Sequence, residues 1–248
     1  MIELSPAARA YLLAFADDEH RIGSRHANWI GLGPFLEEDL AFCSIAQDEL
    51  GHALGLYEMF VPSNEIDRFA LLRAPADYRS CGLAEVECAS WDLALVRHWL
   101  YDTAEQLRWD ALSQSVVPEV AALATQALRD EAFHIEHAAM FLTRISGDHE
   151  AKLRVEAAIE QLLPISASVW SPPDLEEGAV SEGFVAHDSS ELLGRWRHAI
   201  TAQAGGFGLT ADFAAVSPAS NRHGRIETFD SFHSSLGEVI SLDPTAIW

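Results

Sequence analysis

Apolar residues recur at intervals of three and four along most of the first 170 residues, as they do in amphipathic α-helices. In the second of these runs, Leu36, Leu40, Cys43, Leu50 and Leu54 follow this spacing. Glycine, proline and polar residues interrupt the pattern between the runs. The pattern predicts helices over about residues 5–30, 35–60, 83–114, 119–145 and 149–170, and two more near 189–204 and 227–240.

The pattern also bears on the fold class. No segment alternates apolar and polar residues as a half-buried strand does, so we expect no β-sheet. The first four predicted helices have roughly 25 residues each, which is longer than an average globular helix and suits a four-helix bundle. We expect Ser5 to cap the first helix, with Pro6 in its first turn. The stretch between the second and third helices is expected to be an irregular connection.

Composition excludes several classes of function. The chain has 248 residues, 49% of them hydrophobic, which is enough for a sizeable core. A formal net charge of −22 argues against binding to nucleic acid or to a generic membrane surface. No apolar run of about 18 residues predicts a membrane span, and no basic N-terminal region predicts a secretory signal. The three cysteines form no C-x-x-C pair, so we expect reduced, mostly buried thiols in a cytoplasmic protein.

Two Glu-x-x-His motifs stand on the predicted helices, Glu49 with His52 and Glu131 with His134. Residues i and i+3 of a helix share a face, so each pair can offer a carboxylate oxygen and an imidazole nitrogen to one point. A carboxylate-bridged dinuclear centre in a helical bundle uses two such pairs and one further acid from each of the other two helices.

The first and third helices carry acids at matching depth. Glu19 lies 30 residues before Glu49, and Asp102 lies 29 residues before Glu131, with a helix break near the midpoint in both cases. Asp17, Asp18, Glu105 and Asp110 are neighbouring acids, and Glu105 stays open as an alternative to Asp102. The predicted metal ligands are therefore Glu19, Glu49, His52, Asp102, Glu131 and His134.

The competing interpretation is that these residues form surface salt bridges on a solvated helix face. It is disfavoured here because Leu50, Leu54 and Phe133 occupy the same helical turns. A site rich in oxygen ligands, with one imidazole per ion, suits iron or manganese better than zinc. Asp48 and Asp130, just before each motif glutamate, are either acceptors for the ligand histidines or plain surface acids.

These residues lie in segments that resemble the ferritin-like subunits of bacterial ring-1,2-phenylacetyl-CoA epoxidase. AQDELGHALGLY, RDEAFH, WLYDTA and NWIGLGP are similar to segments of its catalytic subunit. The chain length, GPFLEEDLAF, AAIEQLLPISASVW and the tail HGRIETFDSFHSSLGEVISLDPTAIW are more similar to its non-catalytic partner subunit. The resemblance covers nearly the whole chain and is strongest over residues 15–60 and 99–145.

The resemblance implies a single ferritin-like domain over residues 1–248. Its core would be a four-helix bundle over about residues 5–146, with additional C-terminal helices over about residues 149–248. The six predicted ligands fall on the family's iron ligands. The resemblance further implies an O2-dependent diiron monooxygenase of phenylacetate catabolism, with two iron ions (or manganese) and electrons from an external reductase. Its substrate would be an aromatic or acyl-CoA compound.

The alternative interpretation is a non-catalytic structural subunit of a phenylacetyl-CoA epoxidase complex. Iron storage or peroxide scavenging is a third interpretation, which the long irregular C-terminal third disfavours. We expect a homodimer or a hetero-oligomer with a paralogous subunit. Cations for CoA phosphates would come from clusters such as Arg21 with Arg25, or Arg195 with Arg197 and Arg222. His137 is a candidate for a proton path, and Trp99, one turn before Asp102, is a candidate substrate contact.

Overall fold

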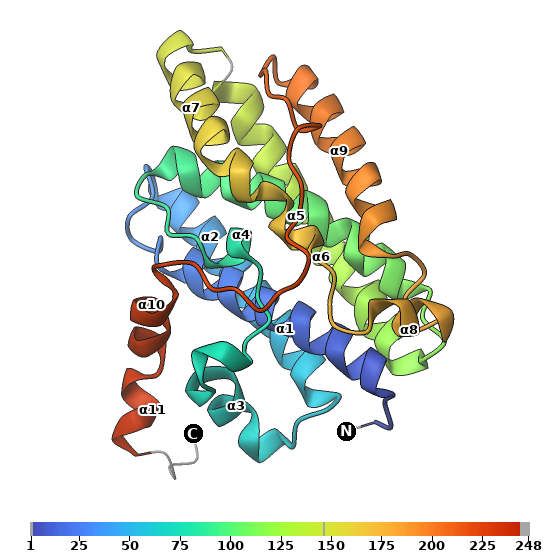
Figure 1. Ribbon diagram of the computed structural model, residues 1–248. Coiled ribbons are helices and arrows are strands. Elements are labelled where there is room, and N and C mark those ends of the chain that lie inside the picture. Colours follow the sequence, from blue (N-terminus) through green and yellow to red (C-terminus); the bar gives the residue numbers. More distant parts are fainter. Residues whose placement is uncertain (1, 146, 244–248) are drawn as a thin grey trace. The chain divides into compact units, whose positions relative to one another are not determined.

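The computed structural model describes residues 2–145 and 147–243, and these residues form helices and loops without a β-strand (Figure 1). The first and last residues of the expected 1–248 domain, and the last five residues of its C-terminal tail, lie outside the described residues. The α-helices are α1 (Pro6–Ala27), α2 (Leu36–Glu58), α3 (Ile66–Leu72), α4 (Gly82–Glu85), α5 (Trp91–Ser113), α6 (Pro118–Ile145), α7 (His149–Ser166), α8 (Glu176–Ser181), α9 (Ser189–Gly206), α10 (Phe229–Leu236) and α11 (Glu238–Leu242). Short 3-10 segments are η1 (Ser63–Glu65), η2 (Pro75–Asp77) and η3 (Ala167–Trp170).

Local sequence explains the first helical hairpin. The hydroxyl of Ser5 accepts a hydrogen bond from the backbone N–H of Ala8 at 3.0 Å, which confirms the predicted cap. After α1 the chain turns through Gly31, whose φ of +85° favours glycine. Asp39 on α2 accepts hydrogen bonds from the backbone N–H groups of Gly31 and Gly33 at 3.0 and 2.8 Å. These contacts close a short loop, and α2 returns along α1.

Several predicted boundaries were wrong. The third long helix begins at Trp91 rather than near residue 83, because Ser90 caps it and residues 86–88 leave the helical conformation. The expected irregular connection contains α3, which buries Ile66 and Ala70 on one face. The carbonyl of Ala70 in turn accepts a hydrogen bond from the hydroxyl of Tyr78 at 2.7 Å. Tertiary contacts of this kind stabilise a seven-residue helix that its own sequence does not.

The described residues divide into two compact units. Unit 1 contains the chain up to Glu87, Pro173–Gly178 and the segment from Asn221 onward. In it α1 packs along α2 and against α4, while α11 contacts α3 and α10 contacts η2. The core of this unit includes Leu12, Phe15 and Leu56.

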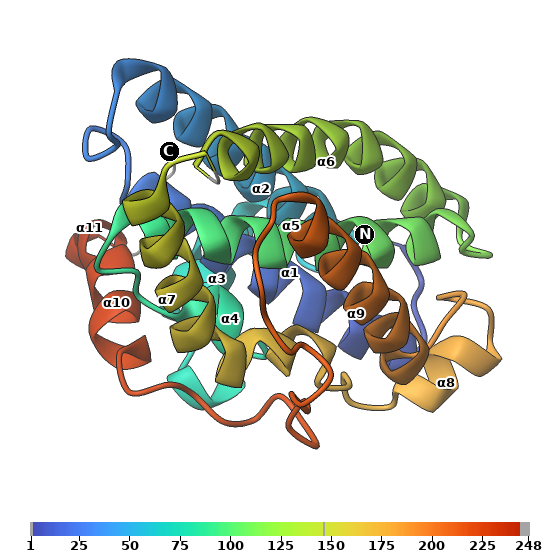
Figure 2. The same ribbon diagram turned by 90° about the horizontal axis from the view of Figure 1, so that it is seen from above.

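Unit 2 contains residues 88–172 and 179–220. Its central element is α5, which packs against α6, α7 and α9 (Figure 2). Trp196 of α9 is fully buried, and its indole N–H donates to the carbonyl oxygen of Leu100 at 3.0 Å. The predicted all-α class is confirmed. Each unit supplies one long helical hairpin, α1–α2 or α5–α6, of the kind from which ferritin-like bundles are built. Among the described residues no helix is both long and apolar enough to cross a membrane.

Candidate metal centre

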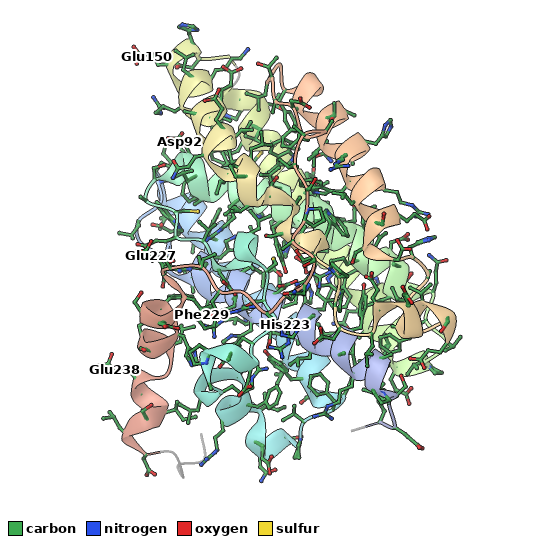
Figure 3. The ribbon with its side chains drawn as sticks, viewed as in Figure 1. Asp92, Glu150, His223, Glu227, Phe229 and Glu238 are labelled. Atoms are coloured by element: carbon green, nitrogen blue, oxygen red, sulfur yellow. The ribbon has the colours of Figure 1, made fainter. Side chains whose placement is uncertain are left out.

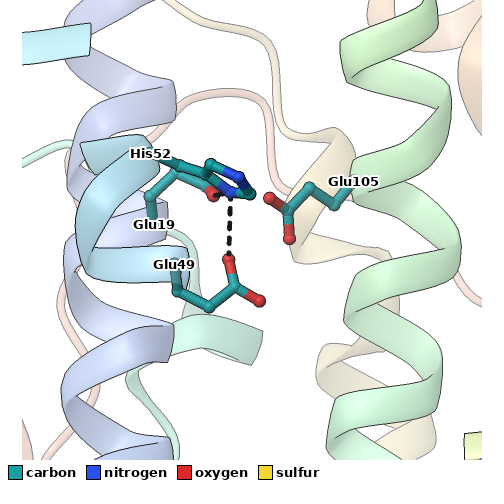
Figure 4. Close-up of side chains that lie close together, drawn as sticks. All are labelled: Glu19, Glu49, His52 and Glu105. Atoms are coloured by element: carbon teal, nitrogen blue, oxygen red, sulfur yellow. Dashed lines mark ion pairs between the residues drawn. The ribbon is translucent and has the colours of Figure 1, made fainter. Parts of the chain in front are cut away.

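Three predicted ligands meet within unit 1. Glu19 lies on α1, and Glu49 and His52 lie on α2 (Figure 4). The Nδ1 atom of His52 lies 3.5 Å from Oε2 of Glu19 and 3.8 Å from Oε2 of Glu49. Both carboxylates are fully buried, and one ligand atom from each of the three side chains lies within 4.8 Å of the other two. Two buried carboxylates this close repel each other, and a divalent cation between them would offset that repulsion.

A glycine brings the two helices together at this level. Gly23 lies one turn after Glu19 on α1. A Cβ atom added to Gly23 would lie 2.9 Å from Cβ of Glu49 and 3.0 Å from Cγ of Leu50. Any larger residue would force α2 away from α1. The close approach of the backbones therefore sets the distance between the Glu19 and Glu49 carboxylates.

The second Glu-x-x-His motif lies in unit 2, on α6. Glu131 and His134 are both fully buried, and Nδ1 of His134 lies 3.4 Å from Oε1 of Glu131. The pair therefore has the same local geometry as Glu49 with His52. Surface salt bridges would leave these groups solvated, so the burial of both motifs excludes that interpretation for the four residues.

The acids of α5 have specific neighbours. Asp102 is buried, and its Oδ2 atom lies 2.6 Å from Nδ1 of His98. Nε2 of His98 lies 3.2 Å from Nδ1 of His137, so the two imidazoles extend a chain of polar contacts from Asp102. Burial lowers the pKa of His98 and of His137 to about 3, with further lowering from neighbouring charges. Both imidazoles are neutral at pH 7, so each has one ring nitrogen that donates and one that accepts.

Glu105, the open alternative to Asp102, is also fully buried on α5. Its Oε1 atom accepts a hydrogen bond from the indole N–H of Trp109 at 2.8 Å. Each of the two acids is therefore held by a residue of its own helix. The assignment of Asp102 as the ligand of this helix stays a prediction.

Two acids beside Glu19 are structural. Asp17 accepts hydrogen bonds from the hydroxyl of Tyr57 at 2.6 Å and from the backbone N–H of Arg79 at 2.7 Å, and it pairs with Arg73. Asp18 accepts from the backbone N–H of Cys81 at 2.6 Å and from Arg222 at 2.7 Å. These partners fix the turn of α1 that carries Glu19. The signal in the sequence was three consecutive acids inside an apolar helix.

The C-terminal segment, in which Figure 3 labels His223, Glu227 and Phe229, supplies further contacts to α1. The guanidinium of Arg21 lies 4.4 Å from the ring centre of Tyr78 and 4.5 Å from that of Phe229. Arg25 lies 3.6 Å from the ring centre of Phe232. Buried arginines stacked on aromatic rings stabilise the packing of this segment on the helix.

The expected cation clusters for CoA phosphates were therefore wrong. Arg21, Arg25 and Arg222 are buried in packing contacts or ion pairs. Arg195 pairs with Glu191, and Arg197 donates to the carbonyl oxygen of Val216. Another group of cations, which the sequence pattern did not indicate, lines a pocket of about 450 Å³ on unit 1. The residues around this pocket are Arg9, Leu13, Phe60, Phe69, Arg73, Asp77 and Arg79.

Three smaller expectations also changed. Leu50, Leu54 and Phe133 were expected in the core beside the motifs, but 37%, 46% and 51% of their surface is exposed. Trp99 is a core residue rather than a substrate contact, since its indole N–H donates to Oε1 of Gln203 at 2.5 Å. All three cysteines are thiols rather than disulfides, but Cys43 is exposed rather than buried.

These observations define the chain as an all-helical protein with buried carboxylate and imidazole groups suited to binding metal ions. The sequence profile described as "Phenylacetic acid catabolic protein" matches residues 3–248, and the chain belongs to this family. Among its relatives is one of the subunits of the 1,2-phenylacetyl-CoA epoxidase of Escherichia coli (strain K12), which is 25% identical over 191 residues. That alignment covers 75% of this chain and 77% of the relative. The resemblance found in the sequence is thereby confirmed.

Proposed function

We propose that this protein is a metal-binding member of the family that takes part in an O2-dependent monooxygenase reaction on an aromatic or acyl-CoA substrate. The observation that carries the proposal is the buried group of Glu19, Glu49 and His52, whose ligand atoms lie within 4.8 Å of one another. The buried Glu131–His134 pair repeats the motif in unit 2. The proposed ligands of two iron ions, or of manganese in their place, are Glu19, Glu49, His52, Asp102, Glu131 and His134.

The donor set fits iron because it combines carboxylate oxygens with one imidazole for each ion. A bound pair of iron ions supplies the capacity to bind and reduce dioxygen with electrons from an external reductase. The protein's own groups position and insulate such a site. Asp17 and Asp18 hold the α1 turn of Glu19, while Asp102, His98 and His137 form a chain of groups along which a proton is held at defined nitrogens.

A second candidate function is that of a structural subunit in a phenylacetyl-CoA epoxidase complex. The similarity to a protein described as one subunit of such an epoxidase favours it. In that role the buried acids would serve only the packing of the helices, and the chain would assemble with a catalytic paralogue. The two functions differ in metal content, since a structural subunit has no need of iron.

The test is iron content per chain in protein produced with added iron, measured beside Glu49→Ala and His134→Ala. Asp48→Asn is the matched control, because Asp48 precedes Glu49 but is only half-buried. The proposal expects about two irons in the wild type and in the control, and a sharp fall in both ligand variants. Iron near zero in the folded wild-type protein would reject the monooxygenase proposal in favour of the structural role.

A further inference from the structure

The outer face of α2 has an unusual composition for a surface helix. Within Leu36–Glu58 the exposed residues are Leu36, Glu37, Leu40, Cys43, Ser44, Gln47, Leu50, Gly51, Leu54 and Glu58. Only Glu37 and Glu58 are charged, and they stand at the two ends. A solvated helix face normally carries charged residues along its length. The middle of this face lacks them, although 38 of the chain's residues are acidic.

The apolar positions on this face have the spacing of a helix-pairing seam. Leu36, Leu40, Cys43, Gln47, Leu50 and Leu54 follow one another at intervals of four, three, four, three and four residues. This is the heptad pattern with which one helix packs against another. The four leucines are 70%, 63%, 37% and 46% exposed, in chain order. We call these six residues the α2 seam.

The α2 seam is self-complementary when reversed. In an antiparallel pair of α2 helices related by a twofold axis, Leu36 would face Leu54 of a second copy. Leu40 would likewise face Leu50, and Cys43 would face Gln47. A twofold interface uses the same patch on both copies, and every leucine here would meet a leucine. A parallel pairing would instead place Gln47 against Gln47 in the middle of the seam.

Charges and space fit the same arrangement. Glu37 would lie opposite Gly51 of the second copy, and Ser44 opposite Ser44, so no acid of the seam's flank would face another acid. Gly51 has open space where a Cβ would stand, so a second helix can approach closely there. The charge of −22 works against pairing of copies elsewhere on the surface, but this uncharged strip avoids the repulsion.

The apolar surface continues beyond the N-terminus of α2. Ile30, Leu32 and Phe35 in the preceding loop are 45%, 67% and 57% exposed. Among the described residues, half of the large hydrophobic side chains with high exposure fall within residues 30–54. In the antiparallel pair this loop would lie near the C-terminal end of the second α2. It enlarges the buried area towards the roughly 1,200 Å² or more that a stable interface needs.

We propose that two copies of this chain pair through antiparallel contact of their α2 seams. The inference does not depend on metal binding, since Glu49 and His52 lie on the opposite, buried side of α2. The protein is expected to sediment as a dimer at micromolar concentration. Leu40→Glu/Leu50→Glu should convert it to a folded monomer, because four acids would enter the interface. Leu153→Glu on α7, where the leucine is 52% exposed, is the matched control and should remain dimeric.

Cross-linking tests the direction of pairing. Under mild oxidation Gln47→Cys should form a disulfide between natural Cys43 of one copy and the introduced thiol of the other. Cys43→Ser/Gln47→Cys should lose most of this cross-link. A wild-type monomer, a dimer that survives the double glutamate change, or cross-linking that is equally strong without Cys43 would each overturn the proposal. So would a chain that stays monomeric alone and assembles only with a different ferritin-like protein.

Discussion

The buried pair of Asp18 and Arg222 gives the sharpest stability prediction. The Asp18 carboxylate lies on α1 beside Glu19, and Arg222 comes from the C-terminal segment 204 residues later. Their side chains are 0% and 2% exposed, and the N–O distance is 2.7 Å. Arg222→Met removes the cation but keeps an apolar side chain of similar length. The variant leaves a buried carboxylate without its main counter-charge.

The magnitude follows from what Asp18 retains. Removing one partner of a buried ion pair costs about 3–5 kcal/mol, because the remaining charge stays desolvated. Asp18 keeps the hydrogen bond from the backbone N–H of Cys81 at 2.6 Å, so the lower end of that range applies. We expect a loss of about 3 kcal/mol in the free energy of unfolding. In an Asp18→Asn background the same change should cost about 1 kcal/mol, since no charge is then stranded.

Urea denaturation followed by circular dichroism measures both values. The control is Arg195→Met, whose partner Glu191 lies at the same distance of 2.7 Å but on the surface, with exposures of 41% and 51%. That change should cost less than about 1 kcal/mol. Equal losses in Arg222→Met and Arg195→Met would refute the argument that burial, rather than distance, decides the strength of the Asp18–Arg222 pair.

Two further predictions concern backbone contact and pH. Gly23→Ala should destabilise the protein by about 1–3 kcal/mol by pushing on Glu49, whereas Gly194→Ala on α9, where a Cβ meets open space, should stabilise it by up to about 1 kcal/mol. Urea midpoints decide this, and a stable Gly23→Ala protein would contradict it. Burial, and then the charge of Arg21, lower the pKa of His233 in the folded state. Its contribution to stability is therefore complete above the unfolded-state pKa of about 6.5 and is lost as the pH falls below it. The wild type should accordingly lose more stability than His233→Gln between about pH 7.5 and pH 5, and parallel losses would exclude the effect.

Local signals in the sequence predicted the elements and the ligand motifs well. The cap at Ser5, the glycine-containing break near residue 31 and the burial of both Glu-x-x-His motifs are all present in the structure. These features depend on residues close together in the chain. Periodicity and spacing therefore contained the information needed to predict them.

What the sequence did not reveal depends on contacts between distant residues. Arg222 and Arg225 pair with Asp18 and Glu85 across more than 100 residues, and neither pair has a local pattern. Helix α3 exists because tertiary contacts cover its one buried face. The spacing of Leu50 and Leu54 correctly indicated a helix, but spacing alone does not tell whether an apolar stripe faces the core or a second molecule.

The central claim is that this chain holds two metal ions through both Glu-x-x-His motifs. The most direct test is titration of metal-free protein with cobalt(II), followed by its visible absorption, beside His52→Gln and His134→Gln. The account predicts saturation at about two equivalents in the wild type, with about one equivalent lost in each variant. Absence of saturable binding in the folded wild type, or variants that bind as the wild type does, would contradict it.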